Sequence, residues 1–308
     1  MAKQNYTRYL VQEHGDFPLE LAGRTPGKGK DIIPGVKAEN VLRVDETKQE
    51  GFFSVDCTWM YSGAAKGPAG VPHKHDFDHI IGIAGGHKDD PQDLGGEITV
   101  WLDGRPEKIV RNSLVFVPAG VVHGPYLFTR VDRPILFVSI ANKGTFSRTV
   151  VKQVAKPERE RKYAIVDYLK KKDFTVAGTG GGAPPPPAVP KHSDGCRILH
   201  IEDDIVKGSF YVDFVWEFSG TGGAPAHAHD HEWPELLAML GSDPEHPYNN
   251  GGEQYITLGD ETLTTSKSTL ICIPPQVMHC PWGFRDVKHP SMIFSAGPSG
   301  MYTGSHKK

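Results

Sequence analysis

The sequence lacks the long hydrophobic runs that would place it in a membrane. Its longest apolar stretches, such as residues 135 to 141, are far shorter than the roughly 20 residues that a spanning helix needs. The amino terminus, MAKQNYTRYLVQEHGDF, also lacks the apolar segment of a secretory signal. We therefore expect a soluble, cytoplasmic protein with no membrane partner.

An excess of positive charge is absent as well. The chain has 34 Lys and Arg against 37 Asp and Glu, a net charge of −3, and no long basic run. Nucleic-acid binding proteins usually carry a basic surface patch, so we expect no nucleic-acid partner. A small-molecule substrate is the default partner, and a homo-oligomer is compatible with this composition.

Cysteine is scarce and shows no metal-binding or redox spacing. The four cysteines contain no Cys-x-x-Cys pair. A chain of 308 residues buries enough surface to fold without disulfides, and it is long enough for two domains of about 150 residues each. We predict free thiols, with Cys57 and Cys272 buried in strands.

Much of the sequence is repeated once within the chain. The stretches VLRVD and GFFSVDCTWMYSG, from residue 41, reappear as ILHIE and GSFYVDFVWEFSG at an offset of 157 residues. After a histidine-rich stretch the match resumes at an offset of 156, as with Pro118 and Pro274 or His123 and His279. This register indicates a tandem duplication.

The repeats and the segment between them predict the domain boundaries. A charged segment, residues 157 to 173, is expected to form a short helix, and GTGGGAPPPPAVP follows as a flexible and partly stiff linker. We predict an N-terminal extension (1 to 39), a first domain (40 to 150), a connection (151 to 190), a second domain (191 to 303) and a tail (304 to 308).

Within each copy the apolar pattern is typical of strands. Phe53, Val55, Cys57, Trp59 and Tyr61 alternate with smaller or polar residues, and the second copy carries the same stripe. Gly, Pro and Asp separate several short runs of this kind, and no long helical pattern occurs. Each half is therefore predicted to be a β-sandwich or barrel.

Histidines recur at matched places in the two copies. Two histidines separated by one residue share a face of a strand and offer adjacent corners of a coordination shell. Near the third position Asp78 competes with His79, and His231 and Glu232 compete with Glu235, but the repeat aligns His79 with Glu235. The predicted metal ligands are His73, His75, His79 and His123 in the first copy, and His227, His229, Glu235 and His279 in the second. The alternative, histidines with no metal, does not account for the repetition.

These motifs resemble the cupin superfamily, specifically its two-domain members, the bicupins. The family's first motif is His-x-His followed by Glu and Gly, and its second is Pro-x-Gly-x-x-His. The first copy has His79 where Glu is usual, and the second has Gln276 where Gly is usual. The resemblance spans about residues 40 to 145 and 196 to 300. It implies an all-β fold of two tandem cupin (double-stranded β-helix, jelly-roll) barrels with a short helical and Pro/Gly-rich connection.

The predicted ligand sets imply up to two divalent transition metals per chain, drawn from Fe, Mn, Ni, Co and Zn. Four neutral histidines would leave the ion its full +2 charge, whereas three histidines and Glu235 would leave about +1. The second site is therefore expected to favour redox work with Glu235 as a catalytic base, and the first to act as a Lewis acid.

The resemblance implies several activities. We expect a metal-dependent dioxygenase acting on a small phenolic, enolic or carboxylate substrate. The alternatives are a redox-neutral isomerase, lyase or decarboxylase, and a non-catalytic metal-dependent binding protein. The candidate pocket residues, which would otherwise be ordinary core, are Trp59, Tyr61, Trp216 and Phe218. Glu97 and Glu253 are candidates for orienting the histidines, or else are exposed turn residues.

Overall fold

Two compact units make up the chain. The computed structural model describes residues 5–15, 17–21, 32–154, 156, 159–167, 192–224 and 227–302. The first unit is Glu13–Tyr168, and the second combines Met1–Gln12 with Leu169–Lys308. The predicted N-terminal extension is thus divided between the units. Among the described residues no helix has the length and apolar character needed to span a membrane.

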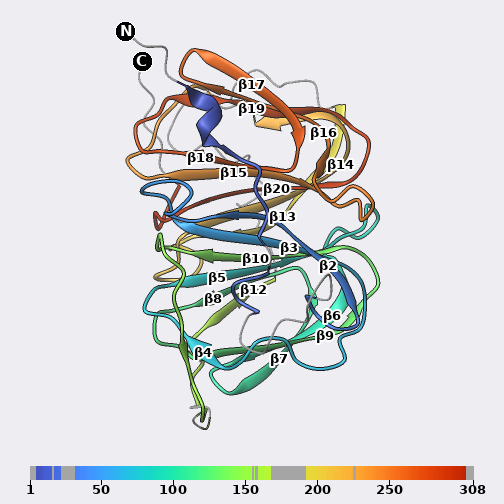
Figure 1. The fold of residues 1–308 in the computed structure, drawn as a ribbon, viewed down its shortest axis with the longest axis vertical. Helices are drawn as coiled ribbons and strands as arrows, with labels where there is room; N and C mark the ends of the chain where they lie inside the picture. Colours follow the sequence, from blue (N-terminus) through green and yellow to red (C-terminus); the bar gives the residue numbers. More distant parts are fainter. Residues whose placement is uncertain are drawn as a thin grey trace. The chain divides into compact units, whose positions relative to one another are not determined.

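The first unit is a single antiparallel sheet that curls on itself (Figure 1). Its strands run in the order β11-β4-β9-β3-β10-β5-β8-β12, with β2 beside β3, β6 beside β9, and β7 beside β6. The bounds are β2 (Val36–Val44), β3 (Ser54–Gly63), β4 (His73–Lys74), β5 (His79–Ala84), β6 (Asp93–Leu102), β7 (Arg105–Arg111), β8 (Ser113–Val117), β9 (His123–Val131), β10 (Ile135–Ala141), β11 (Thr149–Val150) and β12 (Ala164–Val166).

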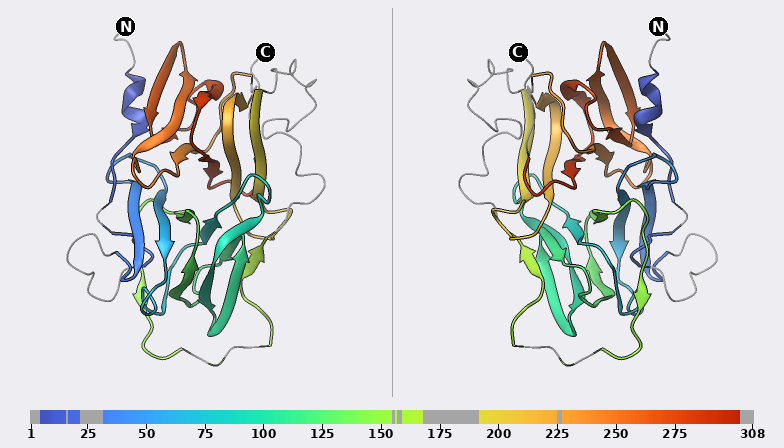
Figure 2. Two further views of the ribbon diagram at one scale, coloured as in Figure 1. Left: turned by 90° about the vertical axis from the view of Figure 1, so that its right-hand side faces the viewer. Right: turned by 90° about the vertical axis from the view of Figure 1, so that its left-hand side faces the viewer.

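The second unit repeats this arrangement. Its sheet order, β1-β18-β15-β20-β14-β19-β16-β17 with β13 beside β14, places equivalent strands next to one another as in the first unit. Figure 2 shows both sets of strands from two further sides. The bounds are the 3-10 helix η1 (Tyr6–Tyr9), β1 (Leu10–Val11), β13 (His192–Ile201), β14 (Tyr211–Ala224), β15 (Glu235–Gly241), β16 (Asn249–Leu258), β17 (Glu261–Lys267), β18 (Thr269–Ile273), β19 (His279–Val287) and β20 (Ser291–Gly297). The predicted all-β architecture of two tandem barrels is confirmed.

Each barrel receives one edge strand from outside its repeat. β1 pairs with β18 through Leu10 and Ile271, and β12 pairs with β8 through Ile165 and Val115. The helix expected over residues 157 to 173 is wrong where the structure describes this segment, because residues 164 to 166 form β12. Its β-branched residues fit a pleated edge, and Val166 is buried there. The linker from residue 168 to 190 lies outside the described residues.

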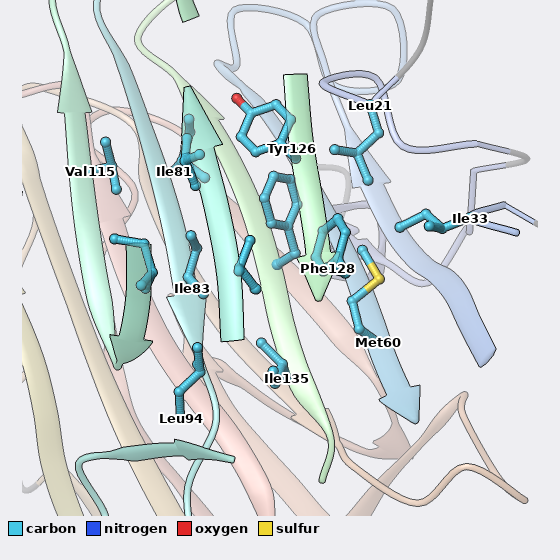
Figure 3. Close-up of a cluster of buried hydrophobic side chains, with 14 of the residues drawn as sticks. Leu21, Ile33, Met60, Ile81, Ile83, Leu94, Val115, Tyr126, Phe128 and Ile135 are labelled. Carbon is cyan, nitrogen blue, oxygen red and sulfur yellow. The ribbon is translucent and has the colours of Figure 1, made fainter. Parts of the chain in front are cut away.

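The interior of the first barrel is a cluster of buried apolar side chains (Figure 3). Met60 from β3, Ile81 from β5 and Phe128 from β9 meet in this cluster, and Leu21 joins them from the segment that precedes β2. Tyr126 lies beside Leu21 with its hydroxyl at the end of the cluster (Figure 3). The apolar core of the first barrel therefore includes a residue, Leu21, from a segment that precedes the repeat.

The departure from the glycine motif at Gln276 has a predicted cost in stability. Gln276 has φ 63°, in the left-handed region, and its counterpart Gly120 has φ 82°. Left-handed backbone costs a non-glycine residue about 1–2 kcal/mol, offset in part by the greater entropy of unfolded glycine. We expect Gln276→Gly to stabilise the fold by about 0.5–1 kcal/mol, and Gly120→Gln to destabilise it by a similar amount. Thermal unfolding of both variants checks the prediction, which fails if both shift the midpoint in the same direction.

Candidate metal centres

Four buried side chains converge in the second unit. Centre 2 consists of His229, His231, Glu235 and His279, whose candidate ligand atoms all lie within 4.8 Å of one another. The Oε2 atom of Glu235 is 3.2 Å from His231 Nε2 and 2.9 Å from His279 Nε2. Glu235 begins β15 and His279 begins β19, so the ends of two strands position this pair.

The first unit holds a group of the same composition. Centre 1 consists of Glu20, His73, His75 and His123, again with the ligand atoms within 4.8 Å of one another. Glu20 Oε1 is 3.0 Å from His73 Nε2 and 3.2 Å from His123 Nε2, and Glu20 Oε2 is 3.4 Å from His75 Nε2. His79 lies beside this group, with its Nδ1 3.9 Å from Glu20 Oε2. Centre 1 therefore depends on a residue that precedes the repeat.

Backbone carbonyls orient most of these imidazoles. His73 Nδ1 bonds to the carbonyl of Val71 at 2.7 Å, and the same bond to the second preceding residue recurs at His123, His229 and His279. His75 Nδ1 instead reaches the carbonyl of Ser147 at 2.6 Å. A carbonyl oxygen can only accept a hydrogen bond, so each of these Nδ1 atoms carries the hydrogen and each Nε2 keeps its lone pair.

The atoms that face each centre fit a cation. In the part of the chain that the structure describes, several of them are buried and have no hydrogen-bond partner, namely Glu20 Oε2, His73 Nε2, His75 Nε2, His123 Nε2, Glu235 Oε2 and His279 Nε2. Buried polar atoms are rarely left in this state unless another group satisfies them. Imidazole and carboxylate donors without thiolate suit a divalent transition metal. Each centre is thus able to hold one such ion.

A tyrosine from the end of the chain reaches centre 2. The hydroxyl of Tyr302 is 2.9 Å from His229 Nε2, and because His229 Nδ1 carries the hydrogen, Tyr302 donates this bond. The Tyr302 ring contacts those of His231 and Trp233 at centroid distances of 5.1 Å and 6.0 Å. Centre 2 therefore combines its four ligand candidates with one hydroxyl donor.

Solved structures share this architecture. Two structures of oxalate decarboxylase from Bacillus subtilis, one at pH 4.6 and one concerned with its Mn(II) centres, match with a TM-score of 0.51 and 12% identity over 94% of this chain and 80–81% of theirs. The fold is that of a two-domain cupin. AerE from Microcystis aeruginosa gives a TM-score of 0.46 at 13% identity, over 94% of this chain and 99% of its own. No protein-family model and no curated protein matches the sequence.

The bicupin fold places one expected ligand away from its centre. His227 is exposed and contributes only its carbonyl to His229, whereas His231 occupies the position expected for a second histidine. An offset of 156 residues relates His73 to His229 and His75 to His231. The His-x-His pair of the second copy is therefore His229 and His231, two residues later than the pair predicted from the sequence, His227 and His229.

The other expected residues lie as follows. His73, His75 and His123 belong to centre 1, and His229, Glu235 and His279 to centre 2. His79 lies on β5 beside centre 1, where its Nε2 is 2.8 Å from Ser139 Oγ. Glu20 had no local sequence signal, because it lies more than fifty residues before His73 and meets it only in the folded barrel.

The expected aromatic pocket lies on the other face of the sheet. In β3, Met60 belongs to the cluster inside the barrel, so the alternation of side chains turns Trp59 and Tyr61 to the opposite face. In β14, Val215 packs against the interior cluster of the second unit, and Trp216 and Phe218 face away from it. These aromatic rings stack on one another in pairs and do not line the centres.

The two glutamates expected to orient histidines instead pair with cations. Glu97 Oε2 is 2.7 Å from Lys108 Nζ, and Glu253 Oε1 is 3.3 Å from Arg285 Nη1. Both cations are exposed by more than half. Ion pairs of this kind contribute at most about 1 kcal/mol, so the glutamates fit a surface role.

The two centres carry the same formal charge. Each combines three imidazoles with one carboxylate, supplied by Glu20 in centre 1 and by Glu235 in centre 2. A divalent ion would keep about one positive charge at either place. The contrast expected between a +2 site and a +1 site therefore does not hold for these two groups.

Opposed charges shift the pKa values in both centres. Burial by itself lowers the pKa of His279, but the Glu235 carboxylate, 2.9 Å from its Nε2, outweighs burial and raises the pKa. Burial would raise the pKa of Glu235, yet the close imidazoles of His231 and His279 lower the pKa to about 2. In centre 1 the pKa of His73 is raised in the same way, against burial, by Glu20.

These shifts predict how metal stabilisation depends on pH. In the metal-free protein the raised pKa of His279 contributes stability that is complete below its unfolded pKa and is lost as pH rises through the folded value. A bound ion requires the neutral imidazole. We therefore expect the increase in Tm on metal addition to be larger at about pH 8 than at about pH 6. Melting curves with and without metal at both pH values check this, and an equal increase at both would refute it.

Proposed function

We propose that this bicupin is a metal-dependent lyase that removes CO2 from a small carboxylate substrate at centre 2. The observation that carries the proposal is the hydroxyl of Tyr302, which lies 2.9 Å from His229 Nε2 beside the ligand candidates. With an ion bound at this Nε2, the hydroxyl would be free to donate to a substrate, because the lone pair of the nitrogen would be taken. Loss of CO2 leaves a carbon that needs a proton, and this hydroxyl, beside the ligand candidates, would supply it. The oxalate decarboxylases of the same fold support dicarboxylates as the first substrates to test.

The ligand group and the ion have separate tasks. His229, His231, Glu235 and His279 would hold a divalent ion. Such an ion, when bound, supplies a Lewis acid that stabilises negative charge on substrate oxygens. Trp233 stacks on His231 at a centroid distance of 4.2 Å and packs near Tyr302, so rings form one wall of the centre. An apolar wall excludes water and strengthens the electrostatic interactions inside it.

Tyr302 is suited to be the proton donor. Burial, and then the negative charge of Glu235, raise the pKa of Tyr302, so the phenol keeps its proton at neutral pH. In the proposed step the bond between the carboxylate carbon and its neighbour breaks, CO2 leaves, and the neighbouring carbon takes the proton of the Tyr302 hydroxyl. Water then returns a proton to the phenolate, so no oxidant or reductant is consumed.

The test combines gas measurements with one substitution. We expect the metal-loaded protein to release CO2 from one member of a panel of dicarboxylates and keto acids without consuming O2. Tyr302→Phe should lower kcat about a hundredfold, the usual contribution of general acid catalysis, and leave the metal content unchanged. Tyr248→Phe, at an exposed tyrosine, is the matched control.

Other outcomes would overturn the proposal. O2 uptake in proportion to substrate would indicate the dioxygenase that the sequence led us to expect. Tight binding of a substrate without turnover would indicate a binding protein. Isomerised product without CO2 would indicate redox-neutral chemistry of a different class.

A further inference from the structure

The carboxylate of centre 1 comes from a short stretch that precedes the first repeat. We call residues 17–21 the N-terminal segment. Its Glu20 is fully buried, and its carboxylate lies among the three imidazoles of centre 1. In centre 2 the carboxylate belongs instead to Glu235, on strand β15 of the barrel itself. The equivalent strand position in the first unit is His79.

The distances around Glu20 are those of ligands that share one ion. Two donors bound at about 2.1 Å stand about 3.0 Å apart at a right angle and about 3.4 Å apart at a tetrahedral angle. The oxygens of Glu20 lie 3.0 Å, 3.2 Å and 3.4 Å from the Nε2 atoms of His73, His123 and His75. All four residues therefore fit a common coordination shell.

The N-terminal segment is held in place on both sides of Glu20. The backbone N–H of Leu19 donates to Asp56 Oδ2 at 2.8 Å, and Arg148 Nη1 donates to the carbonyl of Leu19 at 3.3 Å. Leu21 is 2% exposed within the core cluster of the barrel. Such contacts position the Glu20 carboxylate, although they lie outside the coordination shell.

Two further side chains lie close to the carboxylate of Glu20. The hydroxyl of Tyr126 donates a hydrogen bond to Glu20 Oε1. His79, held by Ser139, places its Nδ1 3.9 Å from Glu20 Oε2. Centre 1 thus has five nearby ligand candidates, one carboxylate and four imidazoles, whereas centre 2 has one carboxylate and three imidazoles beside the Tyr302 hydroxyl. A centre whose positions are filled by protein ligands is typical of a structural site.

We propose that Glu20 is the carboxylate ligand of the centre 1 metal, and that this ion fastens the N-terminal segment to the first barrel as a structural clasp. In the first unit the strand position holds His79, and the carboxylate comes from a different part of the chain. The inference rests on metal binding at centre 1 and is independent of the decarboxylation proposed for centre 2.

The experiment isolates centre 1 and measures binding, with no use of activity. His279→Ala serves as the background, so that one centre remains, and Mn²⁺ is the probe. Glu20→Gln should weaken Mn²⁺ binding at least tenfold, whereas Glu13→Gln should not, because the Glu13 side chain is exposed and pairs with Lys48. Hydrogen exchange of residues 17 to 21 should slow on Mn²⁺ addition in the background protein and remain unchanged with Glu20→Gln.

A double substitution separates the ligand role from a general loss of folding. Glu20→Gln with His79→Glu returns a carboxylate to the strand position that Glu235 occupies in the second unit. We expect Mn²⁺ affinity to recover, while hydrogen exchange in the N-terminal segment stays insensitive to Mn²⁺. Affinity equal to the background in Glu20→Gln, or metal-dependent protection in the double variant, would overturn the proposal. A failure to detect decarboxylase activity at centre 2 would not affect this proposal for centre 1.

Discussion

Replacing His279 with alanine is expected to remove one metal ion per chain and nearly all activity. His279 Nε2 lies 2.9 Å from Glu235 Oε2, and its Nδ1 is fixed by the carbonyl of Val277. Its loss leaves centre 2 with two imidazoles and one carboxylate, which hold an ion weakly. We expect turnover to fall about a thousandfold, since a bound ion contributes several kcal/mol of transition-state stabilisation.

His227→Ala is the matched control for that substitution. His227 is exposed, and only its backbone carbonyl takes part in the centre, so alanine keeps the contact with His229. Metal content by elemental analysis and kcat are measured for both variants. If His227→Ala lost the ion and His279→Ala kept it, the assignment of centre 2 would be wrong.

Phe128→Ala is expected to be the most destabilising substitution in the first barrel. Phe128 is completely buried in the core cluster (Figure 3). Its ring packs edge-on against that of Phe137 at a centroid distance of 5.9 Å. Truncating a buried phenylalanine removes apolar burial and leaves a cavity, at a cost of about 3–5 kcal/mol. We expect the unfolding transition of the first unit to move to clearly lower urea concentration.

The neighbouring residue Leu127 provides the comparison. It lies on the opposite face of β9 and is only partly buried, so Leu127→Ala should cost much less. Urea unfolding followed by fluorescence measures both free energies of unfolding. Equal losses in the two variants would contradict the placement of the core on the Phe128 face.

Most of the fold could be predicted from the sequence because the chain contains an internal repeat. Strand alternation, turn residues and the offset between copies together predicted two β-barrels, and the structure confirms them. Most of the candidate ligands follow from the same reasoning, because His73, His123 and His279 stand at strand ends that the duplication aligns. Local pattern and duplication reinforce each other wherever a contact is made between neighbouring strands.

Two features escaped sequence reasoning for different reasons. His231 was not predicted as part of the His-x-His pair because the preceding AHAH also matches that motif. A constant offset of 156 residues nevertheless relates His73, His75, His79 and His123 to His229, His231, Glu235 and His279. Glu20 was missed because its contacts with His73 and His123 join segments far apart in the chain. Sequence periodicity predicts which residues share a face of one strand. It does not predict which distant segment packs against that strand in the folded barrel.

The two edge strands that come from outside the repeats, β1 and β12, affect how the protein can be divided into fragments. Pairing with β1 covers one edge of β18, and pairing with β12 covers one edge of β8. A fragment cut at the linker would keep the second set of repeat strands and lose residues 10 and 11, leaving backbone groups of β18 open to pairing with another molecule. Fragments that begin after the linker are thus prone to aggregate, and a soluble half-protein needs its distant strand grafted back.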